Sequence, residues 1–119
     1  MPEQDAINRA ALDDLLATTG GDPGFLAELI DTYFEDSATL LPAMRQALAA
    51  GSAEQLRRAA HSLKSNSTSF GAQELAGLCR ALEEESRAGA LGGAEERLAQ
   101  VEAEYDRVRR ALQAARPVG

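Results

Sequence analysis

The sequence predicts an all-α protein, an up-down-up-down antiparallel four-helix bundle with a short additional N-terminal helix that caps one end. The chain contains 24 Ala and 16 Leu but only 3 Val and 2 Ile, so strong helix formers dominate over β-branched strand formers. Apolar residues recur with the period of a helix, and glycines divide the chain into segments joined by short connections. The 119 residues fit a single helical bundle domain over residues 1–119.

A short first helix is expected over residues 5–18, because a pair of glycines at positions 20 and 21 favours the left-handed conformation that commonly ends a helix. A long second helix is expected over residues 23–50. Asp22 is a favourable N-cap residue, and Pro23 suits the first helical position, where its missing N–H costs nothing. The apolar positions that support these two helices include Ile7, Leu12, Leu15, Leu16, Leu26, Leu29, Ile30, Tyr33, Leu40, Met44 and Leu48.

Three further helices are expected over residues 53–70, 72–88 and 94–115. Ser52 and Gln55 form a capping-box pattern at the start of the third helix, and glycines follow the third and fourth. Cys79 lies on an apolar stripe, which indicates a buried structural thiol rather than a redox site. The apolar positions of the last two helices are Leu75, Leu78, Cys79 and Leu82, then Leu98, Val101, Tyr105, Val108 and Leu112.

Charge and composition exclude several functions. The net charge of −7 opposes nucleic-acid binding, and no apolar stretch is long enough to span a membrane. One Cys and one His cannot assemble a structural zinc site, and no metal site is expected. The acidic N-terminus does not resemble a secretion signal, so a cytoplasmic location is expected. The chain has no Walker-type phosphate loop, so direct use of ATP is not expected.

The candidate site lies on the third predicted helix, around the single histidine of the chain. With 100° per residue, the apolar residues Leu56, Ala59, Leu63 and Phe70 lie on the face opposite His61, so His61 points outward. The only lysine, Lys64, lies three residues later and shares its face, although the chain has 11 Arg. The other polar residues within about 60° of His61 are Glu54, Arg57, Arg58, Ser65 and Thr68.

An exposed neutral imidazole beside cations suits nucleophilic attack on phosphorus. Lys64 would lie next to the phosphoryl oxygens, and Arg57 and Arg58 would add positive potential from one turn away. Hydrolase and general acid–base chemistry fit less well, because no carboxylate is evident to orient the ring of His61. Two functions remain: a phosphoryl carrier, and a non-catalytic helical adaptor that docks a signalling partner without phosphotransfer.

The run from Ala59 to Ala72, AAHSLKSNSTSFGA, resembles the histidine-containing phosphotransfer (HPt) domain family. The shared pattern places Leu two and Lys three residues after His61, and Gly-Ala ten and eleven residues after it. The resemblance covers nearly the whole chain. It extends to Phe25, Leu26, Leu29, Tyr33, Phe34, Ala47, Leu48 and Gly51 before the run, and to Leu75, Leu78, Cys79, Leu82 and Glu83 after it.

The resemblance implies a phosphorelay intermediate that accepts a phosphoryl group on His61 from a receiver-domain aspartate and passes it to another. Lys64 would help to hold the phosphate, and Arg57, Arg58, Ser65 and Thr68 would face the receiver. Partners would be response-regulator receiver domains or a hybrid sensor histidine kinase. The chain would need no cofactor of its own, since Mg²⁺ belongs to the receiver, and it would lack autokinase activity.

Two residues depart from the family pattern. Ser65 stands where many members have glycine, which concerns partner specificity. Glu83 stands where some members place glutamine near the phosphate, and a carboxylate there would repel phosphate unless it turned away or paired with an arginine. We therefore do not expect Glu83 to be a phosphate ligand, and the acidic run over residues 83–85 is interpreted as a solvated helix end.

The docking surface is predicted from bundle geometry. A receiver must cover His61, so apolar residues of the first helix, Ile7 and Leu12, are expected to form a docking rim together with the adjoining second helix. A monomer is expected, because the single exposed histidine has to remain reachable.

Overall fold

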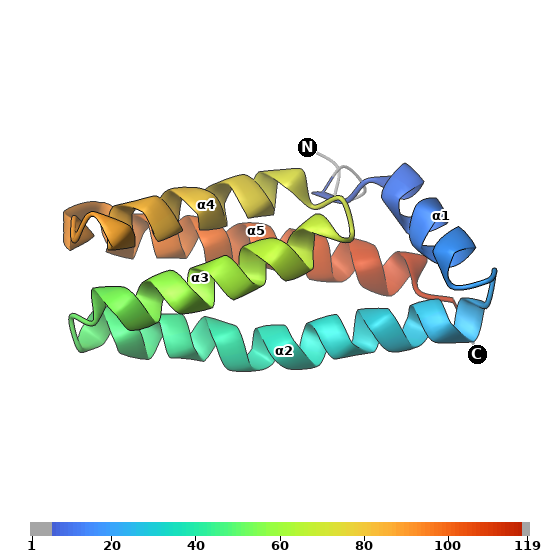
Figure 1. The fold of residues 1–119 in the computed structure, drawn as a ribbon, viewed down its shortest axis with the longest axis horizontal. Helices are drawn as coiled ribbons and strands as arrows, with labels where there is room; N and C mark the ends of the chain where they lie inside the picture. Colours follow the sequence, from blue (N-terminus) through green and yellow to red (C-terminus); the bar gives the residue numbers. More distant parts are fainter. Residues whose placement is uncertain (1–5, 118–119) are drawn as a thin grey trace.

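The computed structural model describes residues 6–117, and within that range it contains five α-helices and no strand. The helices are α1 (Arg9–Thr18), α2 (Pro23–Ala49), α3 (Ala53–Thr68), α4 (Gln73–Arg87) and α5 (Ala94–Ala115), with a short 3-10 helix, η2 (Leu91–Gly93), before α5. Helices α2 to α5 run along the long axis of the molecule, which measures 44 × 26 × 18 Å, and α1 crosses the end at which α2 begins (Figure 1). The predicted all-α bundle with a short additional helix at one end is confirmed.

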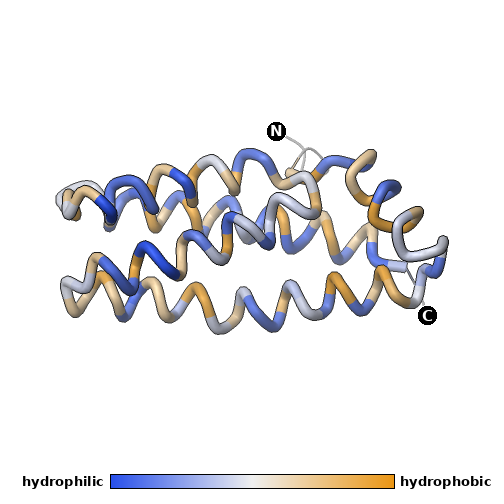
Figure 2. The backbone as a smooth tube through the Cα atoms, in the orientation of Figure 1, coloured by the Kyte–Doolittle hydropathy of each residue, from blue (hydrophilic) through white to orange (hydrophobic). Residues whose placement is uncertain are grey.

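Each long helix packs against the next one in sequence, and α5 also packs against α2, so that α3 and α5 occupy opposite corners of the bundle. Polar and apolar residues alternate along every helix with the period of its turns (Figure 2). One face of each helix therefore lies in a shared core while the other faces outward. In the described part of the chain, no helix is long and apolar enough to cross a membrane.

The helix starts follow the capping residues. The Asp22 carboxylate accepts a hydrogen bond from the Gly24 N–H at 3.0 Å, and the Ser52 hydroxyl accepts one from the Gln55 N–H at 3.3 Å, as their positions predicted. The prediction for the first helix start was wrong, because Asn8 is the N-cap: its side-chain oxygen accepts from the Ala10 N–H at 2.8 Å, and α1 begins only at Arg9. Residue 5, the predicted start, lies outside the described residues.

The connection between α3 and α4 depends on Gly71. Its φ of +69° lies in the left-handed region, and the Ala72 N–H reaches back to the Ser67 carbonyl at 3.2 Å. This turn ends α3 at Thr68, two residues earlier than predicted. A side chain at Gly71 would place its Cβ 2.3 Å from the Cβ of Asn8, so the turn also receives the start of α1.

The core is built mainly from Leu and Ala, with few aromatic residues. Tyr33 is buried and shares a hydrogen bond with Ser67 at 2.8 Å between their hydroxyl oxygens, while Phe34 is half-buried. Cys79 is a buried free thiol, and burial raises its pKa to about 12, as expected for a structural cysteine. The largest fully buried side chains include Ile30, Met44, Leu56, Leu63, Leu75, Leu82, Leu98 and Leu112.

Candidate functional site

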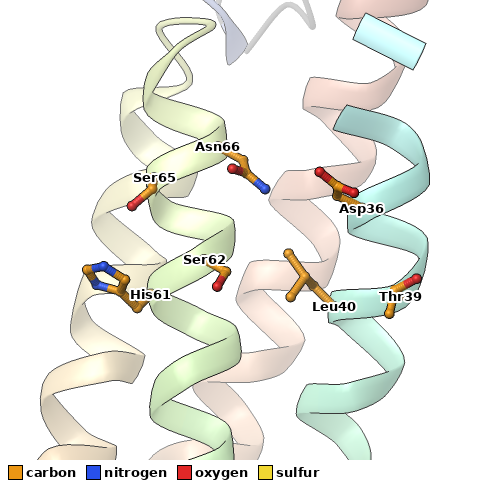
Figure 3. A pocket seen from close by; sticks show the side chains of 7 residues that line it. All are labelled: Asp36, Thr39, Leu40, His61, Ser62, Ser65 and Asn66. Atoms are coloured by element: carbon orange, nitrogen blue, oxygen red, sulfur yellow. The ribbon is translucent and has the colours of Figure 1, made fainter. Parts of the chain in front are cut away.

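His61 lies in the middle of α3, and its side chain is 55% exposed. Leu56 and Leu63, predicted to lie on the opposite face, are fully buried, which confirms the orientation of the helix. His61 projects from the flank of α3 nearer to α4, whereas Ser62 and Asn66 project toward α2 (Figure 3). His61 is therefore held by the bundle on one side and open to solvent on the other.

Glu83 of α4 is the residue that holds the imidazole ring. Its Oε2 lies 2.9 Å from Nδ1 of His61, and its Oε1 accepts a hydrogen bond from Nζ of Lys64 at 2.7 Å. Arg87, one turn further along α4, adds a longer contact of 3.3 Å to the same carboxylate. The Glu83 residue is only 3% exposed. A buried carboxylate thus joins the histidine and the lysine, which the sequence had already placed together on α3.

Two expectations are corrected by this contact. The view that no carboxylate orients the ring of His61 was wrong, because Glu83 does so. The acidic run over residues 83–85 is not a uniformly solvated helix end: Glu83 is buried, Glu84 is exposed, and Glu85 is partly buried and bonded to Arg97 at 2.9 Å. Glu83 also does not turn away from the site, since it pairs with Lys64 and Arg87.

A signal for this position was present in the sequence. Glu83 follows Leu75 by eight residues and Cys79 by four, so it continues the apolar stripe of α4. A carboxylate on a buried stripe requires a partner, because burying an unpaired charge is costly. The helical wheel of α3 alone could not supply that partner, since the contact joins two antiparallel helices across a separation of 22 residues.

The charge of Glu83 determines which nitrogen of the neutral His61 ring carries the proton. The hydrogen bond from Lys64 lowers the pKa of Glu83 below its usual value of 4.5, although burial acts in the opposite direction. The carboxylate is therefore ionised at neutral pH and only accepts hydrogen bonds, so the proton of the neutral imidazole is assigned to Nδ1. Nε2 then carries the lone pair, and within residues 6–117 it has no hydrogen-bond partner.

The other predicted site residues lie on α3, one or two turns before or after His61. Ser65 and Thr68 are exposed, and the Thr68 hydroxyl donates to the Lys64 carbonyl at 2.8 Å. Arg57 and Arg58 both bind Glu54, with contacts of 2.6 and 3.0 Å. Glu54 therefore offsets part of their positive charge, whereas Lys64 and Arg87 are hydrogen-bonded to the same carboxylate as His61.

The predicted docking rim is not found beside His61. Leu12 is a core residue with 4% exposure, and Ile7 lines a depression against the end of α5 rather than a groove that adjoins His61. The groove that does adjoin His61 runs between α2 and α3, and a second one continues from it toward α1. The first is lined by Asp36, Thr39, Leu40, His61, Ser62, Ser65 and Asn66 (Figure 3). The second includes Leu15, Leu29, Thr32 and Phe70.

Known proteins are similar to this chain in sequence and in fold. The Hpt domain family matches residues 28–111. The chain is 34% identical to histidine-containing phosphotransfer protein 4 of Arabidopsis thaliana over 93 residues, covering 76% of this chain and 73% of that protein. It is 33% identical to histidine-containing phosphotransfer protein 2 of the same plant over 96 residues, covering 78% of this chain and 62% of that protein.

A solved structure supports the same assignment. The crystal structure of histidine-containing phosphotransfer protein B (HptB) from Pseudomonas aeruginosa superposes on this fold with a TM-score of 0.87 and 35% sequence identity, covering 93% of this chain and 94% of that one. The family match includes α3 and α4, the two helices that bring His61, Lys64 and Glu83 together. The chain therefore belongs to the Hpt family and is a phosphorelay intermediate that carries phosphoryl groups between receiver domains.

Proposed function

We propose that Nε2 of His61 accepts the phosphoryl group from a receiver-domain aspartate and later passes it to the aspartate of another receiver. The observation that carries this proposal is the contact between Nδ1 of His61 and the buried Glu83 carboxylate at 2.9 Å. It fixes the proton on one ring nitrogen and leaves the lone pair of the other directed away from the bundle. A histidine on the surface without such a partner would rotate and exchange tautomers freely.

The transfer requires no proton movement at the ring. The lone pair of Nε2 attacks phosphorus, the bond between phosphorus and the aspartyl oxygen breaks, and the aspartate leaves as a carboxylate with the electron pair. The product is a phosphorylated imidazolium, whose positive charge is stabilised by Glu83 through the Nδ1 proton. Passing the group to a second receiver is the same step in reverse.

Lys64 is placed to stabilise the phosphoryl oxygens. Its side chain is 28% exposed, and it uses one donor on Glu83 at 2.7 Å. An ammonium group has three donors, so two remain for a phosphoryl group on Nε2. Arg57 and Arg58 contribute positive potential only, because both bind Glu54. This assignment gives Lys64 an electrostatic role in the transfer without making it the nucleophile.

The receiver would dock on the groove between α2 and α3. Small polar side chains, Ser62 and Ser65, flank His61, and Leu40 of α2 supplies an apolar contact at the same groove. Small side chains allow the partner backbone to approach the phosphoryl group closely. We assign Mg²⁺ to the receiver and ATP cleavage to a separate kinase. We further propose that the protein works as a monomer in the cytoplasm, where receiver domains operate.

The test is phosphotransfer from a panel of pre-phosphorylated receiver domains in the presence of Mg²⁺. Transfer to the wild-type protein is expected to be rapid, to be absent in His61→Gln, and to be slower by about 10 to 100-fold in Lys64→Ala, as for loss of an electrostatic group. The phosphate should be acid-labile and base-stable. Labelling of His61→Gln would contradict the assignment. Binding of a receiver without labelling of the wild type would favour the adaptor function.

A further inference from the structure

Glu83 places a full negative charge beside the ring that would carry the phosphoryl group. The carboxylate is buried, and its two oxygens bind Nδ1 of His61 at 2.9 Å and Nζ of Lys64 at 2.7 Å. The third contact, to Arg87 at 3.3 Å, involves a side chain that is 63% exposed. The charge of Glu83 is thus offset mainly by Lys64, which is the same cation that a phosphoryl group on His61 needs.

We propose that Glu83 makes phosphorylated His61 a high-energy phosphoryl donor, which biases net flow from this protein toward receiver aspartates. This inference rests on the proposed function, because it concerns the equilibrium position of the same transfer. It assigns to one carboxylate the direction in which the protein passes on its phosphoryl group.

The first reason is electrostatic. A phosphoryl group on Nε2 carries two negative charges and sits roughly 6 Å from the Glu83 carboxylate, on opposite sides of one imidazole ring. At that distance in a water-like medium, the repulsion alone corresponds to about a tenfold shift of the equilibrium against the phosphorylated form. The phosphorylated ring gains one positive charge that lies closer to Glu83, and its attraction reduces the net shift to about twofold. Lys64 cannot fully compensate for both anions, since it already donates to Glu83 at 2.7 Å.

The second reason concerns the leaving group. When a receiver aspartate attacks phosphorus, the bond between phosphorus and Nε2 breaks, and its electron pair returns to the ring. The ring leaves as neutral imidazole only if Nδ1 keeps its proton during the transfer. Glu83 accepts the hydrogen bond from that proton and so keeps Nδ1 protonated, which makes neutral imidazole the leaving group. This contact speeds donation to the receiver, whereas the electrostatic repulsion sets the equilibrium. No co-reactant besides the receiver is required.

Glu83→Gln separates charge from geometry. A glutamine oxygen in the place of Oε2 accepts the same hydrogen bond from Nδ1, but the side chain is neutral. Lys64 is then released to the phosphoryl group. The matched control is Glu84→Gln, which removes the same charge from the next residue of α4, where the side chain is 57% exposed and bonded to Arg80.

The experiment measures how phosphoryl groups partition at equilibrium between the protein and one phosphorylated receiver with Mg²⁺. Glu83→Gln is expected to raise the ratio of phosphorylated protein to phosphorylated receiver about twofold or more, because the net repulsion is lost and Lys64 is released, and to lengthen the lifetime of the isolated phosphohistidine. Glu84→Gln should leave the ratio unchanged. Arg87→Gln removes an exposed cation beside Glu83 and should lower the ratio. The change should be smaller than the one caused by Glu83→Gln, because solvent screens the exposed side chain.

The outcomes distinguish this inference from the proposed function. A wild-type protein that is not labelled on His61 by any receiver refutes the proposed function. A labelled wild type, with an equilibrium ratio unaltered or lowered by Glu83→Gln, refutes the role of Glu83 alone. If circular dichroism shows that Glu83→Gln does not fold, Arg87→Gln provides the test. A lower ratio of phosphorylated protein to phosphorylated receiver in Arg87→Gln supports the inference, and an unchanged ratio overturns it.

Discussion

Gly71 forms the turn between α3 and α4, and replacing it by alanine tests how that turn holds the N-terminal helix. Two costs are expected. An alanine at a φ of +69° is strained by roughly 1–2 kcal/mol. Its Cβ would also lie 2.3 Å from the Cβ of Asn8 and 3.0 Å from that of Ala11, so the start of α1 has to move.

Moving α1 adds to the strain. The Asn8 N–H donates to the Phe70 carbonyl at 3.3 Å, and loss of this bond costs about 1 kcal/mol. Displacement also loosens the packing of Leu12, which is 4% exposed. Gly71→Ala is therefore expected to lower the free energy of unfolding by about 2–4 kcal/mol, which urea denaturation followed by circular dichroism measures.

Gly51→Ala is the matched control for this measurement. Gly51 has a φ of +68°, nearly that of Gly71, but a Cβ at this position meets nothing within 4 Å. The control should therefore lose only the roughly 1–2 kcal/mol of backbone strain. Equal losses in the two variants, within about 0.5 kcal/mol, would refute the inference that Gly71 is required for the close approach of α1.

Three further predictions concern the groove, the core and the pH dependence of stability. Leu40→Ala should weaken receiver binding by about 1–2 kcal/mol in calorimetry. Leu12→Ala should instead lower the free energy of unfolding by about 2–5 kcal/mol. Weaker receiver binding by a stable Leu12→Ala protein, with Leu40→Ala binding normally, would show that Leu12 is a docking residue. Ser67→Ala breaks the buried hydrogen bond to Tyr33 and should cost about 1–3 kcal/mol in urea unfolding; failure of added Tyr33→Phe to recover any of it would contradict this role. The pKa of Glu83 lies below 4.5 in the folded protein, so its stabilisation is present above that pH and is lost as the pH falls through the lowered pKa. Unfolding free energies measured at several pH values should therefore fall less steeply below pH 4.5 in Glu83→Gln, and an unchanged slope would show that the ion pair does not contribute.

The outward position of His61 could be predicted because it depends only on the geometry of one helix. The angular separation of His61 from Leu56 and Leu63 follows from 100° per residue, and no knowledge of neighbouring helices is needed. The second and third helix starts were predictable for a similar reason, since Asp22 and Ser52 cap the residues that directly follow them.

Contacts between helices could not be predicted from the sequence in the same way. The partner of His61 comes from α4, and its side chain meets the ring only because the Gly71 turn sets the register of two antiparallel helices. The prediction of the docking rim was wrong for a related reason. Apolar spacing identifies Ile7 and Leu12 as residues that need burial, but it does not say which corner of the bundle α1 will cover.

The start of α1 is set by a capping side chain rather than by the spacing of apolar residues. Ile7 fits the apolar pattern, yet the Asn8 side chain caps the backbone at Ala10 and prevents the helix from extending earlier. A polar residue with high capping preference inside a predicted helix therefore deserves as much weight as the surrounding hydrophobic residues.

The hairpin formed by α3 and α4 has a consequence for how proteins of this kind diversify. His61, Lys64 and Glu83 all lie within one continuous segment of 23 residues that is folded back on itself by a single turn. Leu40 and Leu15, which line the neighbouring grooves, belong to other helices. Mutations in α1 and α2 would thus change part of the groove surface while the hairpin keeps the reacting groups aligned, so that partner choice can vary without a change in the transfer chemistry.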